Sequence, residues 1–417
     1  MTPWWSRPGL EVRDGRLLVA GRDAESLARE HGTPVYVYDL VRIEEQARSL
    51  IDAFELAGAP FRLRLALKAQ REPEVLAFVR AIGSVGIDVC SPREIDHALA
   101  HGWTAEELSF TGTNLSERDL DAIVPSGVHV NLDLLSQLAR FGRRAPGSTV
   151  GIRINPRAGA SSRPGLTELY TGAERPSKFG ILQEQLDAAL EIARSHDLRL
   201  DTVHFHVGRV LLTDALPGLE VAADRAARVA RRLLDAGHPV VEVNAGGGLG
   251  VPYDGDTRPL DVDAFATVLA RKLGPLGVTI ACEPGDFLVK EMGVLLAEVV
   301  SVEDRGAHRF VGVDAGFNIA PERFIYDEPI PLVVCRAADA TGERPVTVAG
   351  NINEGDDLWA EDLPLPEVRE GDVIALLRVG SYNRSMHIDH CMRPPAGTVA
   401  FADRALTSSA TGADPGA

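Results

Sequence analysis

The 417-residue sequence is poor in lysine, in closely spaced cysteines and in long apolar runs. Its four cysteines lie far apart, so the sequence indicates neither a Cys-x-x-Cys motif nor a disulfide framework. No apolar run approaches the length of a membrane span. The first seven residues lack the apolar core of a signal peptide. We therefore expect a protein that works in the reducing environment of the cytoplasm.

The charge and composition exclude further classes of protein. A net charge of −17 disfavours nucleic acid and anionic membranes as partners. Apolar residues make up 45% of the chain and charged residues 25%, which is typical of a soluble globular protein. The length leaves room for two domains, or for one barrel and a smaller unit. The net charge says little about a small substrate, because local fields in a cleft can oppose the net sign.

Strand-like and helical patterns alternate between about residues 40 and 285. The strand-like runs are 61–67, 84–89, 107–111, 128–131, 149–154, 200–206, 240–244 and 278–282. The helical patterns are 42–57, 72–81, 92–101, 116–123, 133–142, 184–195, 215–236 and 262–273. Eight such alternations predict an α/β fold with a (β/α)8 barrel of the TIM type.

Outside this region, strand-like runs predominate at both ends of the chain. The N-terminal segment has the strand-like runs 10–19 and 35–38 around a helical pattern at 25–31. The strand-like runs of the second half are 294–302, 309–313, 331–336, 345–350, 373–379 and 397–401. We expect a C-terminal β domain that N-terminal strands complete. The predicted organisation is an N-terminal segment of this β domain (1–38), the barrel (39–288), the C-terminal β domain (289–403) and a disordered tail (404–417).

Lys68, one of only four lysines among 43 basic residues, ends the strand-like run that begins at Phe61. Strand alternation places Lys68 on the polar face, which would point into the barrel at the C-terminal end of the strand. An enclosed lysine loses hydration, so its pKa falls and its amine becomes nucleophilic. Such an amine can form a Schiff base. The alternative is a snorkelling or ion-paired lysine.

Gly246, Gly247 and Gly248 follow another apolar strand. Consecutive glycines let backbone N–H groups approach an anion such as phosphate. A Rossmann loop would open a helix, but Pro252 and Tyr253 follow at once. A tight turn without a ligand is the remaining alternative.

Two histidines, a glutamate and a tyrosine complete the candidate site. His204 and His206 share one face of a strand, where they would bind a metal, offer one ring to a flat cofactor, or be structural. Glu283 follows the last barrel strand and would keep a pyridine nitrogen protonated, unless it is a surface residue before a turn. Tyr382 follows a later strand and would bind phosphate or cap the core.

Together these motifs resemble the fold-type III pyridoxal-phosphate decarboxylases, the family of the diaminopimelate, ornithine and arginine decarboxylases. The match runs from Gly32-Thr-Pro-Val-Tyr-Val-Tyr38 to Met392-Arg-Pro394 and looks most like a diaminopimelate decarboxylase. The resemblance implies decarboxylation of an amino acid, with pyridoxal phosphate bound to Lys68 as a Schiff base. It also implies a head-to-tail homodimer with shared active sites.

Two alternatives share this fold type or its cofactor. A racemase or epimerase would keep the pyridine unprotonated with an arginine, and Glu283 argues against it. A non-catalytic pyridoxal-phosphate-binding protein usually lacks the β domain. A metal-dependent hydrolase would need more ligands than His204 and His206, so we expect no metal.

The resemblance assigns further roles, motif by motif. The implied catalytic residues are Lys68, His206, Glu283, Asn353 and Glu354. The implied cofactor-binding residues are Lys68, Asp88, His206, Arg209, Gly246, Gly247, Gly248, Glu283, Gly285, Asp286 and Tyr382, with Glu94 beside Asp88. The implied substrate-binding residues are Arg153, Lys178, Glu322, Arg323, Tyr326, Asp327, Asn353 and Glu354.

The chain departs from the family pattern at several of these positions. Asn353 stands where the family has a cysteine that protonates Cα, and an amide cannot donate that proton. The proton would come instead from Lys68, from a histidine such as His387, or from water.

The family's Glu-Pro-Gly-Arg ends here in Asp286, and its His-Val-Gly-Ser ends in Arg209. We expect Arg209 to contact the cofactor phosphate or to pair with Asp286. Glu322 stands where diaminopimelate enzymes have an arginine for the far carboxylate of the substrate, although Arg323 follows. A carboxylate there would repel that group. We therefore expect a substrate other than meso-diaminopimelate, either a cationic diamino acid or an amino-acid conjugate of specialised metabolism.

Overall fold

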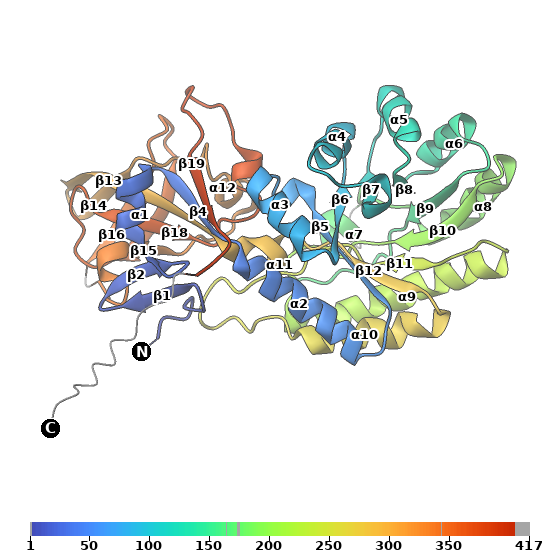
Figure 1. Ribbon diagram of the computed structural model, residues 1–417, viewed down its shortest axis with the longest axis horizontal. Coiled ribbons are helices and arrows are strands. Elements are labelled where there is room, and N and C mark those ends of the chain that lie inside the picture. Colours follow the sequence, from blue (N-terminus) through green and yellow to red (C-terminus); the bar gives the residue numbers. More distant parts are fainter. Residues whose placement is uncertain (1, 164, 173–175, 343, 405–417) are drawn as a thin grey trace. The chain divides into compact units, whose positions relative to one another are not determined.

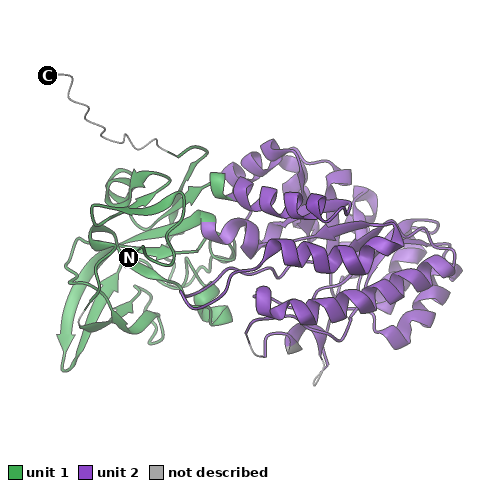
Figure 2. Ribbon diagram, turned by 90° about the horizontal axis from the view of Figure 1, so that it is seen from below, with its two compact units in different colours: residues 1–42, 292–417 green, residues 43–291 purple. Residues whose placement is uncertain are grey.

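The computed structural model describes residues 2–163, 165–172, 176–342 and 344–404. The tail expected to be disordered lies, beyond Arg404, outside the described residues. The chain forms two compact units, residues 43–291 and residues 1–42 with 292–417, which we call the barrel unit and the β unit (Figure 2). Among the described residues, no helix is long and apolar enough to cross a membrane.

Eight parallel strands close the barrel, as the sequence predicts. They are β5 (Phe61–Ala66), β6 (Val85–Val89), β7 (Leu108–Gly112), β8 (His129–Leu132), β9 (Thr149–Arg153), β10 (Arg199–His204), β11 (Glu242–Asn244) and β12 (Thr279–Cys282). Pairing of β12 with β5, in register from Ile280 to Phe61, closes the ring. The carboxyl ends of all eight strands therefore share one rim, where barrel enzymes place their active sites.

The longer helices lie on the outer side of these strands (Figure 1). They are α2 (Val41–Leu56), α3 (Pro73–Ile82), α4 (Pro92–Ala100), α5 (Glu117–Ile123), α6 (Leu135–Arg144), α8 (Leu186–Ser195), α9 (Leu216–Asp235) and α10 (Val262–Leu273). Two short helices, α7 (Glu168–Thr171) and α11 (Asp286–Val289), follow β9 and β12. Their ends follow local signals. Ser91, for example, accepts a hydrogen bond from the Glu94 N–H and caps α4, and Pro92 occupies the first turn.

The β unit combines strands from both ends of the chain. Its larger sheet contains β4 (Val35–Asp39), β13 (Gly293–Arg305), β14 (His308–Val313), β15 (Leu332–Val334), β16 (Pro345–Ala349), β17 (Leu358–Pro364), β18 (Val373–Leu377) and β19 (Gly397–Phe401). Strand β4 pairs with β13 and β19, so an N-terminal strand completes this sheet. A smaller sheet consists of β1 (Leu10–Arg13), β2 (Arg16–Val19) and β3 (Arg22–Asp23).

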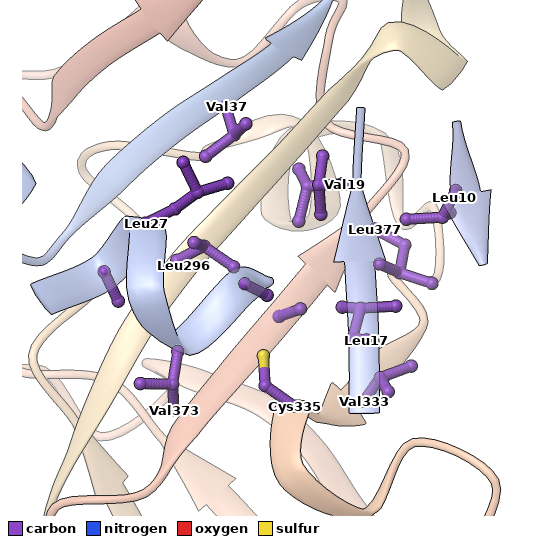
Figure 3. Packing of buried hydrophobic residues seen from close by; sticks show 14 of the residues in the cluster. Leu10, Leu17, Val19, Leu27, Val37, Leu296, Val333, Cys335, Val373 and Leu377 are labelled. Carbon is purple, nitrogen blue, oxygen red and sulfur yellow. The ribbon is translucent and has the colours of Figure 1, made fainter. Parts of the chain in front are cut away.

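An apolar core holds the β unit together (Figure 3). Leu17 and Leu27 come from the N-terminal segment, and α1 (Ala24–His31) carries Leu27. They lie with Leu296 of β13 and Leu377 of β18 in one buried cluster. Residues as far apart in sequence as Leu17 and Leu377 therefore share one core, and burial of their apolar surface stabilises the unit.

The structure differs from the sequence expectation at several elements, among them the following three. The run 10–19 is a hairpin rather than one strand, because Asp14 and Gly15 both adopt positive φ between β1 and β2. Strand β17 and the short helix α12 (Glu322–Tyr326) were not expected. Neither has a clear apolar period, since β17 buries Trp359 alone among its seven residues.

Candidate active site

Lys68 lies in a 3₁₀ turn, Leu67–Ala69, just beyond β5. The strand ends at Ala66, and the Gln70 N–H closes the turn on the Leu67 carbonyl. The Lys68 side chain is 50% exposed, so the expectation of an enclosed lysine on the strand itself is wrong. The turn carries the amine out to the rim of the barrel, where another molecule can reach it.

Asp88 of β6 is the carboxylate beside Lys68. Its Oδ2 lies 3.7 Å from the Lys68 Nζ, while its Oδ1 is buried and has no hydrogen-bond partner among the described residues. Burial raises the pKa of Asp88 well above its usual range, and the charge of Glu283 raises it further. Lys68 opposes both effects. Asp88 is therefore a carboxyl group whose proton depends on the charge of its lysine neighbour.

Glu283 follows β12 and is buried beneath the same rim. Its Oε2 lies 3.1 Å from the His204 Nε2, and its Oε1 accepts a hydrogen bond from the Asn244 amide. Burial alone would raise the pKa of Glu283. The charge that His204 carries when it is protonated at low pH, its hydrogen bond, Arg64 and Asn244 together lower it to about 2. Glu283 is thus an ionised carboxylate, in contrast to Asp88.

An ion pair that sequence reasoning missed lies below Glu283. Arg64 of β5 donates two hydrogen bonds, of 2.8 and 3.1 Å, to Glu242 of β11, and both residues are buried. Its Nη1 is 4.0 Å from the Glu283 Oε1. Arg62, at the exposed end of the strand, also bonds Glu242. Alternating polar residues along β5 were visible in the sequence, but their partner on β11 was not.

The glycine loop is tied to this network. Gly246 adopts φ +67° and Gly248 φ +92°, and the Gly246 N–H donates to the Asn244 Oδ1 at 2.9 Å. A Cβ at Gly247 would lie 2.4 Å from the Glu283 carbonyl oxygen, so close packing alone already requires glycine there. Within the described part of the chain, the N–H groups of Gly247 and Gly248 donate to no acceptor. They can therefore bind an external anion.

His206 lies two residues beyond the end of β10, and Arg153 is the last residue of β9. Burial lowers the pKa of His206 well below its usual value, and Arg153 lowers it further, so its ring is neutral. Tyr170 approaches that ring edge-on, with centroids 5.0 Å apart. The Arg153 guanidinium lies 4.4 Å from the centre of the Phe179 ring, and the exposed Lys178 lies 4.9 Å from it. The site therefore has a neutral aromatic ring and a buried guanidinium.

Asp286 begins α11, immediately after Gly285. Its Oδ1 lies 3.4 Å from the Nζ of Lys290, one helical turn along, and the Lys290 side chain is only 3% exposed. Sequence reasoning missed Lys290, although a buried lysine four residues after a carboxylate on a helix is a recognisable signal. At the position where the resemblance implies an arginine, the chain thus has Asp286 paired with the buried Lys290. Contact between Arg209 and the phosphate stays a prediction.

In the β unit, Glu322 opens α12 and is 2% exposed. The Asn383 amide donates to the Glu322 Oε2 at 3.0 Å, and the Glu322 N–H donates back to the Asn383 Oδ1. Arg323 donates to the Trp359 carbonyl oxygen and lies 3.6 Å from Asp327. Arg323 therefore contacts the Trp359 carbonyl and the Asp327 carboxylate.

Two tyrosines lie near this helix. Tyr326 meets Tyr382 edge-on, with ring centroids 6.4 Å apart. Tyr382 adopts φ +49°, which is unusual for a bulky residue. Such backbone strain persists where the surrounding structure fixes it, and it is common at functional sites.

Asn353 and Glu354 occupy an exposed loop of the β unit that Asp357 organises. The Asp357 carboxylate accepts hydrogen bonds from the N–H groups of Ile352 and Phe317. Glu354 lies 2.9 Å from the His390 Nε2, so a histidine stands beside the position where the family has its cysteine.

The barrel residues fit pyridoxal phosphate. Lys68 offers an accessible amine, the glycine loop offers backbone N–H groups for a phosphate, and His206 offers a neutral ring. Glu283 accepts hydrogen bonds from His204 and Asn244. A carboxylate can accept about four hydrogen bonds, so Glu283 can also bind a pyridine N–H.

Comparison with known proteins agrees with this fit. The family model of the pyridoxal-dependent decarboxylases, for their pyridoxal-binding domain, matches residues 40–290. A diaminopimelate decarboxylase of Methanothermobacter thermautotrophicus is 36% identical over 398 residues, which cover 93% of this chain and 91% of the relative.

Solved structures agree as well. Diaminopimelate decarboxylase of Helicobacter pylori, complexed with L-lysine, superposes with a TM-score of 0.81 at 29% identity, covering 90% of this chain and 93% of the other. The enzyme of M. jannaschii, also with L-lysine, gives 0.84 at 25% identity, covering 94% and 92%. The chain therefore belongs to the pyridoxal-dependent decarboxylases, and pyridoxal phosphate is its cofactor.

Proposed function

We propose that this protein decarboxylates an amino acid whose far end carries an amine or a neutral group, and that meso-diaminopimelate is not its preferred substrate. The observation that carries the proposal is the buried Glu322, at the position where the family resemblance places a carboxylate-binding arginine. A carboxylate opposite a second carboxylate costs about 3 kcal/mol, roughly 100-fold in binding.

Asp286 and Arg323 also support a substrate other than meso-diaminopimelate. Asp286, at the second position where the resemblance implies an arginine, forms an ion pair with Lys290 at the end of α11. Arg323, the residue best placed in sequence to compensate for Glu322, reaches Asp327 and Trp359. These contacts favour a cationic diamino acid, or an amino-acid conjugate of natural-product or siderophore biosynthesis.

Decarboxylation of meso-diaminopimelate is the second candidate. It is favoured by the 36% identity, over 93% of the chain, to a relative of that name. L-lysine, which is bound in two of the related structures, carries an amine at the end of its side chain. Binding of this amine does not require an arginine.

Carbon dioxide release separates the two candidates. We expect the holoenzyme to release it from a diamino acid or a conjugate at a kcat/KM at least roughly tenfold above that for meso-diaminopimelate. Glu322→Gln should bring the two kcat/KM values closer together, because it removes the negative charge with little change in the shape of the side chain. Glu361→Gln, on the exposed part of β17, is the matched control and should leave the ratio unchanged. A wild-type preference for meso-diaminopimelate would contradict the proposal.

The barrel residues divide the work of the reaction. Bound pyridoxal phosphate supplies an electron sink for the electron pair that stays on Cα when carbon dioxide leaves. Lys68 provides the amine that holds the cofactor, and Asp88, 3.7 Å away, holds a proton for that amine. Glu283 keeps a proton on the ring nitrogen, and His206 offers its neutral ring to the cofactor. Hydride reduction followed by peptide mapping should find the pyridoxyl group on Lys68.

The active unit is proposed to be a cytoplasmic homodimer. The four cysteines are free, which fits a reducing compartment. Asn353 and Glu354 are exposed in the single chain, as residues contributed to a partner's site would be. Sedimentation equilibrium should give twice the mass of one chain, and a monomeric active enzyme would contradict this part of the proposal.

A further inference from the structure

His204 ends β10 and reaches Glu283 across the inside of the barrel. Its side chain is 3% exposed, and its Nε2 is 3.1 Å from the Glu283 Oε2. Its Nδ1 is buried and makes no hydrogen bond to any described residue. The two ring nitrogens thus have different surroundings, and this difference determines where the proton lies.

The unpartnered Nδ1 indicates a neutral imidazole. If His204 were cationic, Nδ1 would carry a buried N–H without an acceptor, which is costly. If Nδ1 alone carried the proton, Nε2 would direct a lone pair at a carboxylate oxygen. Only the neutral form with its proton on Nε2 both donates to Glu283 and leaves no donor unpaired. Burial also lowers the pKa of His204, although Glu283 opposes this shift.

Asn244 is the second neutral donor to Glu283, and its orientation is fixed. Its Oδ1 accepts the Gly246 N–H at 2.9 Å, so its amide nitrogen faces the Glu283 Oε1. Arg64 lies 4.0 Å from Glu283 and gives its two hydrogen bonds to Glu242. Among the described residues, the side-chain hydrogen bonds to the Glu283 carboxylate therefore come from Asn244 and His204, and Arg64 adds a longer ion pair.

We infer that His204 is a positioning residue that stays uncharged, donates its Nε2 proton to Glu283, and thereby biases the shared proton toward the ring nitrogen of the cofactor. A cation at His204 would neutralise Glu283 and weaken its hold on that nitrogen. A neutral donor orients the carboxylate and stabilises its negative charge without cancelling it. The inference rests on the proposed contact between Glu283 and the ring nitrogen.

The state of His204 can be tested without a variant. Nitrogen NMR of holoenzyme labelled with ¹⁵N-histidine should show His204 protonated at Nε2 and unprotonated at Nδ1 between about pH 6 and pH 8. A resonance pair typical of imidazolium in that range would overturn the inference.

The effect on the cofactor is tested with pyridoxal phosphate labelled with ¹⁵N in its ring. His204→Phe keeps a ring of similar size but removes both nitrogens, so the ring resonance should move toward the unprotonated position. Loss of a hydrogen bond to a charged group is expected to change the proton distribution roughly 10- to 100-fold. His204→Gln keeps a neutral N–H donor and should restore most of the wild-type shift.

His129→Gln is the matched control, because His129 also bonds a barrel carboxylate, Asp201, at 2.7 Å. It should leave the ring resonance unchanged. If Glu283→Gln fails to move that resonance, the proposed role of Glu283 is wrong. If Glu283→Gln moves it and His204→Phe does not, only the role of His204 is wrong.

Discussion

Asp88 and Glu283 are two buried carboxyl groups of one barrel, and their pKa values move in opposite directions. The side chains have nearly equal exposure, about 4% each. Glu283 has donors from β10 and β11 and a guanidinium nearby, and its pKa falls to about 2. Among the described residues, one Asp88 oxygen accepts no hydrogen bond and the other lies 3.7 Å from the Lys68 amine, and the pKa of Asp88 rises well above the usual range.

The comparison shows that hydrogen-bond donors, and not depth of burial, decide the charge of a carboxyl group in this barrel. Two such groups can serve different ends of one cofactor, because one stays negative while the other exchanges a proton with its neighbour. Variants of the two residues should therefore differ in activity and in the pH dependence of their stability.

Glu283→Gln should have the largest effect. It removes a fixed negative charge from the proposed ring-nitrogen contact, so kcat should fall roughly 10²- to 10³-fold. Asp88→Asn should reduce kcat less, because the neutral form is the one that burial favours. Steady-state decarboxylation rates of the two holoenzymes measure this difference. Equal losses would remove the functional distinction between the two groups.

The pH dependence of stability should have opposite signs at the two sites. The pKa of Glu283 is lowered in the fold, so its contribution is present above the usual value of 4.5 and is lost as pH falls toward about 2. The pKa of Asp88 is raised, so its contribution is present below 3.8 and is lost as pH rises through the folded value.

Urea unfolding of cofactor-free protein measures these contributions. The stability difference between wild type and Glu283→Gln should shrink on acidification by up to about 1.4 kcal/mol per pH unit. The difference between wild type and Asp88→Asn should change in the opposite direction, with wild type losing stability relative to the variant as pH rises. If both stability differences changed with pH in the same direction, the charges assigned to Glu283 and Asp88 would be wrong.

Lys68→Met should have the smallest effect on stability. Lys68 lowers the pKa of Asp88, so its removal should raise that pKa further. The pH range over which Asp88 makes the free energy of unfolding fall should then extend to higher pH. We expect a change of less than about 1 kcal/mol, because the lysine side chain is half exposed. Lys272→Met, which removes a lysine paired with Glu220 on the outer helices, is the control. An effect of Lys68→Met no larger than that of the control would show that Asp88 does not sense its neighbour.

The barrel was predictable because each of its strands carries its own local signal. Apolar runs bounded by helical periods indicate β5 to β12 individually, and parallel closure follows from their alternation. Strand β17 lacked such a signal, because its exposed residues include Glu361 and Asp362. The 3₁₀ turn at Lys68 was also hidden, because the alternation of the run continues through Leu67 and Lys68.

The candidate site was predictable in part. Lys68, Asp88 and Glu283 follow strand ends and belong to quotable motifs. Arg64 and Glu242 were missed because they are 178 residues apart, and only barrel closure through β12 brings β5 and β11 together. Asn244 was visible at the start of the glycine loop, but its amide has a role only once Gly246 and Glu283 are placed on either side of it.

Strand β13 passes from one set of partners to another along its 13 residues. Residues Val294–Glu298 pair with β18, residues Val299–Arg305 pair with β14, and the register shifts between Val299 and Ser301. An insertion at that shift would displace side chains in two pairings at once. The exposed turn between Arg305 and His308, where Gly306 has φ +67°, carries no such constraint. A fluorescent label or affinity tag in the β unit should therefore be placed at this turn.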